Sequence, residues 1–398
     1  MKIVQINSFS NGSTGKIMMS IHKELLNKGY DSYVVWGRGR NSRNSYEIYL
    51  NDKIGLYSHV LYSRLTGKNG FASKKATKNL IKQLEDLKPD IIHLHNIHGY
   101  YINIEILFDY LRKNNIKVIW TLHDCWAFTG QCAYFTAVGC DKWKNGCYNC
   151  PKINKYPKAF KDNSKRNYKL KRELFTGLDI TIVTPSSWLA KLVRMSYLKE
   201  YKIKIIHNGI DLSVFKKSNS DFRKKYNLEN KKIILGVAST WDKRKGLDDF
   251  IRLAKILDDN YMIVLVGLSE KQIANIPNNI IGITRTENQQ GLVGIYSTAD
   301  ILFNPTYEDN YPTVNLEALA CGTPVLSYDT GGSIEFEKFI KTKDINYVIK
   351  KENISKNINI IKEQIDKIIN SKLELKNTDV LDEKKMVNEY IKLYNEEL

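Results

Sequence analysis

The chain has no apolar run that approaches the ~18 residues of a membrane-spanning helix. Its N-terminus, which reads MKIVQIN, becomes polar too soon for a secretory signal peptide. There is no internal sequence repeat, and no motif of an RNA- or DNA-binding fold accompanies the basic residues. We therefore expect a cytoplasmic protein that neither spans a membrane nor binds nucleic acid.

Acidic residues are few relative to basic ones. The 43 Asp and Glu oppose 61 Lys and Arg, which gives a formal net charge of +18. Such an excess favours an anionic partner, namely nucleic acid, an acidic lipid surface or a phosphorylated substrate. The chain is also rich in Lys, Ile and Asn, so a general bias in composition, and not binding alone, contributes to this excess of positive charge.

Two clusters concentrate the positive charge. Residues 152–173 contain only two acids, Asp162 and Glu173. The basic residues of this segment are Lys152, Lys155, Lys158, Lys161, Lys165, Arg166, Lys169, Lys171 and Arg172. The second cluster contains Arg64, Lys68, Lys74, Lys75 and Lys78. Each cluster is either a solvated face or a docking surface for an anionic membrane or a lipid diphosphate.

The length of 398 residues suits two αβ domains, and 42% hydrophobic residues indicate a globular chain. Alternating strand and helix patterns predict a doubly wound sheet in the first half, and the pattern restarts near residue 232. The boundary is expected at residues 206–211, where Asn208 and Gly209 suit a hinge.

The expected elements can be given by residue range. Strands are expected at 2–6, 32–36, 91–95, 117–122 and 180–184, then at 232–237, 262–266, 300–303 and 325–327. Helices are expected at 15–26, 79–87 and 103–113, then at 246–257 and 292–297, with a last amphipathic helix at 382–398.

The segment from Glu308 to Val325 places acidic side chains at both edges of a helix start. Pro312 suits the first helical position, and Gly322 with Pro324 marks the helix end. Free N–H groups and the positive end of the helix dipole gather at such a start, so a diphosphate can bind there. Nearby carboxylates can accept hydrogen bonds from sugar hydroxyls. The segment therefore predicts a sugar-nucleotide site.

This segment resembles the E-x7-E signature of the retaining, two-domain (GT-B) glycosyltransferases of family 4. The sequence ACGTPV from Ala320 and the TGG triplet from Thr330 also match that family. The resemblance implies that Glu317 holds the nucleotide ribose and that the first acid faces the donor sugar. Asp309 lies eight residues before Glu317 and Glu308 nine, so both are candidates for the first acid. Thr313 at the helix start belongs to the implied donor site.

The resemblance implies the fold as well: α/β, GT-B, with two Rossmann-like doubly wound domains facing an interdomain cleft. We expect an acceptor-side domain over residues 1–207 that carries a cysteine-rich insertion (132–150) and the basic segment (152–173). A donor-nucleotide-binding domain is expected over 208–381, and the helix over 382–398 is expected to cross back to the first domain. The IHNGID stretch resembles the family's turn at the start of the interdomain linker.

Loops that follow strands supply the other candidate residues. Gly12, Thr14 and Gly15 follow the first strand and resemble the family's glycine-rich loop near the donor diphosphate. His123 ends another strand and matches the family's histidine that contacts the transferred sugar. An ordinary glycine turn before a helix and a core or solvent-facing histidine are the alternative interpretations.

A third motif concerns the donor phosphates, which the family grips with an R-x5-K pair. Lys245 fits the lysine, but Ser239 and Thr240 stand where the arginine belongs, which leaves Arg244 as the candidate for the missing charge. A cation is needed because the leaving nucleoside diphosphate develops negative charge in the transition state.

Four of the six cysteines, Cys132, Cys140, Cys147 and Cys150, lie within nineteen residues. In a reducing compartment this spacing favours a closed, four-thiolate zinc site over disulfides. Two redox disulfides or buried free thiols are the alternatives. We expect a structural zinc in a loop too long to hold its shape unaided, and no catalytic metal. The stretch from His123 to Tyr134 also resembles the capsule and colanic-acid branch of the family.

The sequence therefore predicts a retaining hexosyltransferase that uses a UDP- or GDP-sugar. The expected acceptor is a glycan or a polyprenyl-diphosphate-linked intermediate of surface polysaccharide biosynthesis, at the inner face of the membrane. The family implies that departure of the diphosphate and attack by the acceptor hydroxyl occur on one face of the sugar, with a β-phosphate oxygen as the base. A GT-B sugar-nucleotide 2-epimerase and a non-catalytic partner subunit of a glycosyltransferase complex are the alternatives.

Overall fold

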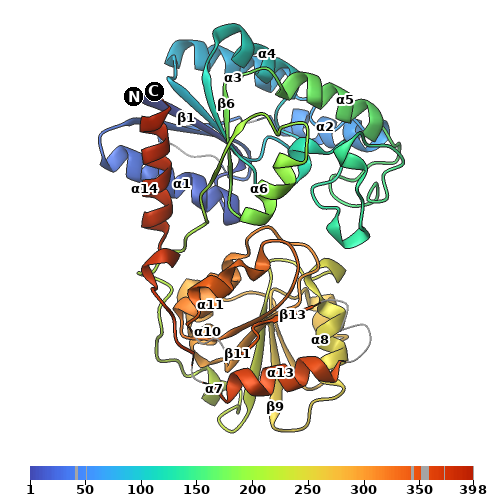
Figure 1. Ribbon diagram of the computed structural model, residues 1–398, viewed down its shortest axis with the longest axis vertical. Coiled ribbons are helices and arrows are strands. Elements are labelled where there is room, and N and C mark those ends of the chain that lie inside the picture. The colour runs from blue at the N-terminus through green and yellow to red at the C-terminus, as the bar shows by residue number, and fades with distance from the viewer. Residues whose placement is uncertain (41–43, 51, 342–344, 351–357, 372, 398) are drawn as a thin grey trace. The chain divides into compact units, whose positions relative to one another are not determined.

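The structure is a computed structural model that describes residues 1–40, 44–50, 52–341, 345–350, 358–371 and 373–397. The chain forms two compact units (Figure 1). The first consists of Met1–His207 together with Met386–Leu398, and the second of Asn208–Lys385. Each unit is an open parallel sheet with its own helices, so each is described by itself.

The first unit contains a seven-stranded parallel sheet in the order β3-β2-β1-β4-β5-β6-β7. The order reverses between β1 and β4, which is the point where doubly wound sheets bind ligands. The strands are β1 (Lys2–Phe9), β2 (Asp31–Arg38), β3 (Glu47–Tyr49), β4 (Ile91–Leu94), β5 (Lys117–Thr121), β6 (Ile180–Thr184) and β7 (Lys202–Ile205). The helices are α1 (Gly12–Asn27), α2 (Lys53–Thr66), α3 (Lys74–Leu87), α4 (Ile104–Asn114), α5 (Ser164–Phe175) and α6 (Ser187–Arg194).

The last helix of the chain, α14 (Glu383–Glu396), completes the core of the first unit. Helix α14 lies beside α1 (Figure 1), and its buried residues Val387 and Leu393 share one apolar cluster with Ile17 and Ile21 of α1. Tyr394 Oη lies 2.6 Å from His93 Nδ1 in β4. Leu398, the final residue of the helix expected at 382–398, lies outside the described residues.

The second unit contains a six-stranded parallel sheet in the order β10-β9-β8-β11-β12-β13, which reverses between β8 and β11. Its strands are β8 (Lys232–Val237), β9 (Tyr261–Val266), β10 (Ile280–Ile283), β11 (Ile301–Asn304), β12 (Val325–Tyr328) and β13 (Val348–Ile349). Its helices are α7 (Phe222–Lys225), α8 (Leu247–Ala254), α9 (Glu270–Ile273), α10 (Gln289–Thr298), α11 (Thr313–Ala320) and α13 (Asn359–Ile369). Buried aliphatic strands form its core, as expected for a sheet covered on both faces.

The expected fold class is confirmed, because both sheets are doubly wound and parallel. The strands expected at 180–184 and 232–237 occur with those bounds, whereas α1 begins three residues earlier than expected, at Gly12. The sequence patterns did not predict α2, α5, α6 or β10. Within the described part of the chain, no helix combines the length and the apolar character that crossing a bilayer requires.

Candidate functional site

A lysine and an aspartate join the loops that follow two neighbouring strands of the second unit. Lys245 Nζ lies 2.6 Å from Asp309 Oδ2, and both side chains are largely buried. Lys245 lies in the loop after β8 and Asp309 in the loop after β11, the strands between which the strand order reverses. The implied phosphate-binding lysine and one candidate first acid therefore meet at the point where doubly wound sheets bind ligands.

Glu308, the other candidate for the first acid, is almost completely buried, with 1% of its surface exposed. Its backbone O accepts a hydrogen bond from Arg244 Nη1 at 2.9 Å, and Arg244 O accepts one from Tyr307 N at 2.8 Å. Arg244 thus braces the acid-bearing loop through both its side chain and its backbone.

The TGG triplet holds the acid-bearing loop from the opposite side. Gly331 has φ +62°, and a Cβ added there would lie 1.9 Å from Asp309 O. Gly332 N donates to the same oxygen at 3.2 Å, and Thr330 Oγ1 donates to Thr306 O at 2.6 Å. Only a residue without a side chain fits against the loop at Gly331, so the triplet fixes the position of Asp309.

Helix α11 carries Glu317, the second acid of the motif. The helix begins at Thr313, so Pro312 is the N-cap rather than the first helical residue as expected, and it offers no side-chain capping bond. One turn later, Glu317 Oε2 accepts a hydrogen bond from Tyr296 Oη at 2.9 Å. Burial beside Glu317 holds the pKa of Tyr296 well above its usual range, so its hydroxyl stays a donor.

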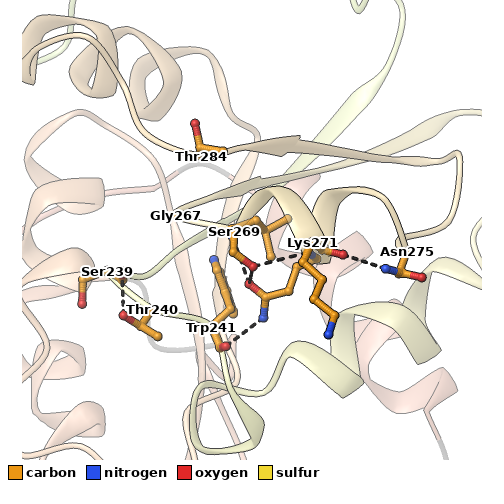
Figure 2. A pocket seen from close by; sticks show the side chains of 10 residues that line it. Ser239, Thr240, Trp241, Gly267, Ser269, Lys271, Asn275 and Thr284 are labelled. Atoms are coloured by element: carbon orange, nitrogen blue, oxygen red, sulfur yellow. Dashed lines mark hydrogen bonds between the residues drawn. The ribbon is translucent and has the colours of Figure 1, made fainter.

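A cavity of about 650 Å³ opens at the carboxyl ends of β8, β9 and β10 (Figure 2). It is lined by Ser239, Thr240, Trp241, Gly267, Leu268, Ser269, Lys271, Gln272, Asn275 and Thr284. Trp241 Nε1 donates to Val266 O at 2.9 Å, and Gln272 Nε2 donates to Trp241 O at 2.9 Å, so hydrogen bonds fix two of its walls. Asp242 Oδ1 accepts from Lys245 N at 3.0 Å and leads the chain from this cavity directly to Lys245. The volume suits a small organic ligand.

His123, which is half-buried, lies in a row with the buried histidines His93 and His95 near the carboxyl ends of β4 and β5. His123 Nε2 lies 3.1 Å from His95 Nδ1, and the two rings are stacked. The His95 ring also contacts the His93 ring, at a tilt of 36°, and His93 Nε2 lies 2.8 Å from Thr121 Oγ1. Burial lowers the pKa of His123 to about 4 and that of His93 to about 3, and it holds the pKa of His95 well below 6.5. All three rings are therefore neutral at neutral pH.

The hydrogen bonds of this row fix which nitrogen of His123 carries the proton. Gln5 Nε2 donates to Met18 O at 3.3 Å, so Gln5 Oε1 faces His95 Nε2, 3.2 Å away. A neutral His95 must then carry its proton on Nε2 and accept at Nδ1. His123 consequently donates through Nε2 and has its lone pair on Nδ1. Gln5 sets the tautomer of His123 through an intervening ring.

A histidine–aspartate pair lies beside His123. His98 Nε2 is 2.9 Å from Asp124 Oδ2, whose partner oxygen accepts from Trp126 N at 2.8 Å. His95, His98, His123 and Asp124 line one cavity of about 10 Å³, roughly the size of one water molecule. The sequence analysis did not name His95 and His98, although His95 directly follows β4 and His98 lies in the same loop.

The glycine-rich loop of the first unit forms the first turn of α1. Asn7 Nδ2 donates to Thr14 Oγ1 at 3.2 Å, which ties this turn to the end of β1. A Cβ added at Gly15 would lie 2.5 Å from the carbonyl carbon of Ser10, so the helix can pack this closely on the loop only with glycine there. Gly12 opens the helix with nothing within 4 Å of an added Cβ.

The four clustered cysteines line one small cavity, and all six cysteines are free thiols. Gly130 N donates to Cys147 Sγ at 3.2 Å, and a hydrogen bond from the Cys132 thiol lowers the pKa of Cys150 to about 7. Disulfides are absent from this cluster. Among the residues that the structure describes, no group of three or more His, Cys, Asp or Glu is arranged to hold a metal ion. The structure therefore does not show the expected zinc site.

The basic run of residues 152–173 does not form one exposed face. Lys171 is buried, its Nζ donates to Thr129 O at 2.7 Å and to Trp126 O, and it lies 3.6 Å from the centre of the Trp126 ring. Burial lowers its pKa to about 7. Lys165, Arg166 and Lys169 are exposed on α5. Lys171 must therefore be removed from the predicted docking surface.

Comparison with known proteins identifies the class. Residues 14–214 match the family model "Glycosyltransferase Family 4", and residues 218–384 match "Glycosyl transferases group 1". The first match covers half of the chain, so the protein belongs to glycosyltransferase family 4.

Two curated relatives and one solved structure place it within that class. WcaC of Escherichia coli K12, a glycosyl transferase assigned to colanic acid biosynthesis, is 26% identical over 82% of this chain and 83% of its own length. The capsular polysaccharide biosynthesis glycosyltransferase CapM of Staphylococcus aureus is 23% identical over 50% of this chain and 53% of its own length. HepE of Anabaena in complex with UDP-glucose has the same fold over the full length of both chains, with a TM-score of 0.64 and 13% identity. The chain is therefore a glycosyltransferase of the polysaccharide-biosynthesis type, as the sequence predicted.

Proposed function

We propose that this glycosyltransferase is a retaining enzyme that transfers a hexose-type sugar from a nucleoside diphosphate sugar to a glycan or a polyprenyl-diphosphate-linked acceptor. The observation that carries the proposal is the Lys245–Asp309 ion pair at the strand-order reversal of the second unit. The lysine can bind donor phosphates, and the adjacent carboxylate can accept hydrogen bonds from the transferred sugar. Glu317, already held by Tyr296, would bind the ribose hydroxyls.

The remaining residues fit the same donor. The cavity beside Trp241 would take the nucleoside, because the chain leads from it straight to Lys245. In the first unit, the turn from Gly12 to Gly15 would approach the diphosphate. Neutral His123, with its lone pair on Nδ1, would accept a hydrogen bond from a sugar hydroxyl.

The chemistry follows from this arrangement. The bond from the anomeric carbon to the diphosphate oxygen breaks, and a bond to the acceptor oxygen forms on the same face of the sugar. The acceptor proton passes to a β-phosphate oxygen. Lys245 would exchange Asp309 for the phosphate as negative charge develops on the leaving group, and this exchange leaves Asp309 for the sugar. The reaction would take place in the cytoplasm, at the inner membrane face, with the exposed part of the basic segment near the lipid.

Incubation with UDP- and GDP-sugars, with and without a polyprenyl-diphosphate-linked acceptor, tests this function. We expect a glycosylated acceptor and nucleoside diphosphate in equal amounts, with the anomeric configuration of the donor kept. Release of nucleoside diphosphate and an epimerised sugar without acceptor would instead identify a 2-epimerase. Binding of the acceptor or a partner enzyme with no turnover of any donor would identify a non-catalytic subunit.

Variants of the acids test the residue assignments. Glu317→Gln should weaken donor binding by roughly 1.5–3 kcal/mol, because it removes a charged acceptor. Asp309→Asn should lower turnover more than Glu308→Gln, since Asp309 makes the ion pair with Lys245. Donor binding by isothermal calorimetry and initial rates would measure both effects. Wild-type kinetics in Glu317→Gln, or a larger turnover loss in Glu308→Gln, would refute the corresponding assignment.

We also propose that Cys132, Cys140, Cys147 and Cys150 hold a structural zinc. Support comes from their shared cavity and from the backbone donor on Cys147, which suits a thiolate; the observed thiol positions are the argument against it. Elemental analysis of protein purified without chelator should give about one zinc per chain, and Cys147→Ser should lower both zinc content and melting temperature. Metal-free protein whose thiols all titrate in the native state would reject the zinc.

A further inference from the structure

Helix α2 exposes a row of large apolar side chains. Ile54, Tyr57, Leu61 and Leu65 follow one another at intervals of three and four residues, so they lie along one face of the helix. Their exposed fractions run from 57% to 83%. The opposite face, which carries His59 and Ser63, is buried. The helix is therefore amphipathic with its apolar side outward, which is the reverse of a helix that packs on its own core.

Phe160 extends this row beyond the end of the helix. Its side chain is 68% exposed, and its N donates to Arg64 O at 2.8 Å. Asn167 Nδ2 donates to Gly67 O at 2.6 Å, which fixes the start of α5 against the end of α2. We call Ile54, Tyr57, Leu61, Leu65 and Phe160 the α2 face. A contiguous group of this kind marks an interaction site rather than an ordinary surface.

The charges around the α2 face are positive. Helix α2 itself contains no acidic residue, and Lys53 and Arg64 are exposed on it. Beyond Phe160 the exposed side chains include Lys158, Lys161 and Lys165. The acids nearest in the sequence make hydrogen bonds to the backbone: Asp52 caps α2 through Gly55 N, and Asp162 accepts from Cys150 N and Ser164 N.

A groove of about 420 Å³ lies at the C-terminal end of the α2 face, between α2, α3, α4 and α5. Lys68, Lys74 and Arg166 line it together with the apolar side chains of Phe71 and Leu170, and Glu105 is the one acid in its lining. Three cations over an apolar floor match a phosphate headgroup with the start of its acyl chains.

We propose that the α2 face docks on an anionic membrane. Its apolar side chains would enter the boundary between headgroups and acyl chains, and the flanking lysines and arginines would contact lipid phosphates. An apolar helix face framed by cations is the arrangement of interfacial helices, in which apolar burial and attraction to anionic lipid act together. A second copy of this chain fits poorly, because its α2 face would bring like charges together. The inference rests on the membrane-face location in the proposed function and names the surface that would make this contact; no residue of the α2 face belongs to the donor site.

Sedimentation with vesicles tests the proposal. Wild-type protein should bind vesicles containing 30% phosphatidylglycerol and should bind pure phosphatidylcholine far less. Leu61→Asp/Leu65→Asp should raise the lipid concentration for half-maximal binding by at least about tenfold. Val138→Asp, which alters an exposed apolar residue elsewhere in the first unit, should bind like wild type. Nucleotide-sugar binding should be unchanged in all three proteins, which separates a failure of this proposal from a failure of the donor-site assignment.

A second readout reports where the helix lies. Tyr57→Trp should gain quenching by brominated acyl chains in anionic vesicles, and circular dichroism should show that each variant keeps the wild-type fold. Unchanged vesicle binding in Leu61→Asp/Leu65→Asp, or equal binding to neutral lipid, would overturn the proposal. So would concentration-dependent self-association that the double variant abolishes without any vesicle binding, because the α2 face would then be a contact between copies.

Discussion

The two units have the same strand order around their switch points, yet they hold their functional side chains by opposite means. The second unit uses charge: Lys245 and Asp309 form an ion pair between two loops. The first unit uses neutral rings, because burial keeps His93, His95 and His123 deprotonated. All seven histidines lie at or before His207, and none belongs to the second unit. Ionised groups thus lie where phosphate charge is expected, and uncharged hydrogen-bonding groups lie where sugar hydroxyls are expected.

The largest effect should come from lowering the pH, because all the histidines lie in the first unit. The pKa of His59 and that of His123 are lowered by burial to about 4, and that of His93 to about 3. As pH falls below 6.5, the unfolded chain binds these protons before the native one does, so the stabilisation is full above 6.5 and is lost toward pH 4. At pH 5 each of the three should cost the first unit about 1–2 kcal/mol. Hydrogen exchange at pH 7.5 and 5 should show selective loss of protection in the first unit, and equal loss in both would contradict the prediction.

Removing the charge of Lys245 in the second unit should lower the rate of transfer rather than the stability of the protein. Lys245→Ala should lower kcat roughly 100- to 1000-fold, as loss of a group that stabilises transition-state charge commonly does. Lys243→Ala is the matched control, because Lys243 is an exposed lysine of the same turn, and it should stay near wild type. Initial rates at saturating donor measure both. Equal losses in the two variants would show that general positive charge, and not the placed lysine, is what matters.

The smallest effect should follow from the tautomer relay of the first unit, by which Gln5 sets the tautomer of His123 through the His95 ring. Gln5→Leu removes the acceptor that orients His95, so His123 should populate both tautomers and turnover should fall about tenfold or less. Nitrogen-15 NMR of histidine-labelled protein reports the protonated nitrogen directly. Ser32→Ala removes the partner of the buried His22, 2.8 Å away and outside the row, and should leave the His123 signals unchanged. A single Nε2–H tautomer of His123 in Gln5→Leu would disprove the relay.

Local patterns predicted the sheets well and the contacts poorly. Continuous apolar strands such as Ile180–Thr184 are buried on both faces, so their sequence alone predicts them. Helix α2 escaped prediction because its buried face is polar and its exposed face apolar, and α5 was interpreted only as a basic run. For the site, the motif spacing indicated Lys245 and Glu317 and left Asp309 and Glu308 as the two candidates for the first acid. The hydrogen-bond partners of the site residues could not be predicted from spacing. Only the tertiary fold brings Tyr296 to Glu317, and Gln5 to the His95 ring that contacts His123.

The return of α14 to the first unit has a consequence for how the protein is made. Residues 386–397 are synthesised after the whole second unit, yet Tyr390 and Tyr394 close the core beside His93 and Thr121. During synthesis, the apolar surface of Ile3, Ile17 and Ile91 therefore stays uncovered by α14 until the whole second unit has left the ribosome. The second unit is in effect an insertion within the first, so the N-terminal core is completed only when α14 has left the ribosome. A premature stop before Met386 would therefore damage the half of the protein that had been translated first.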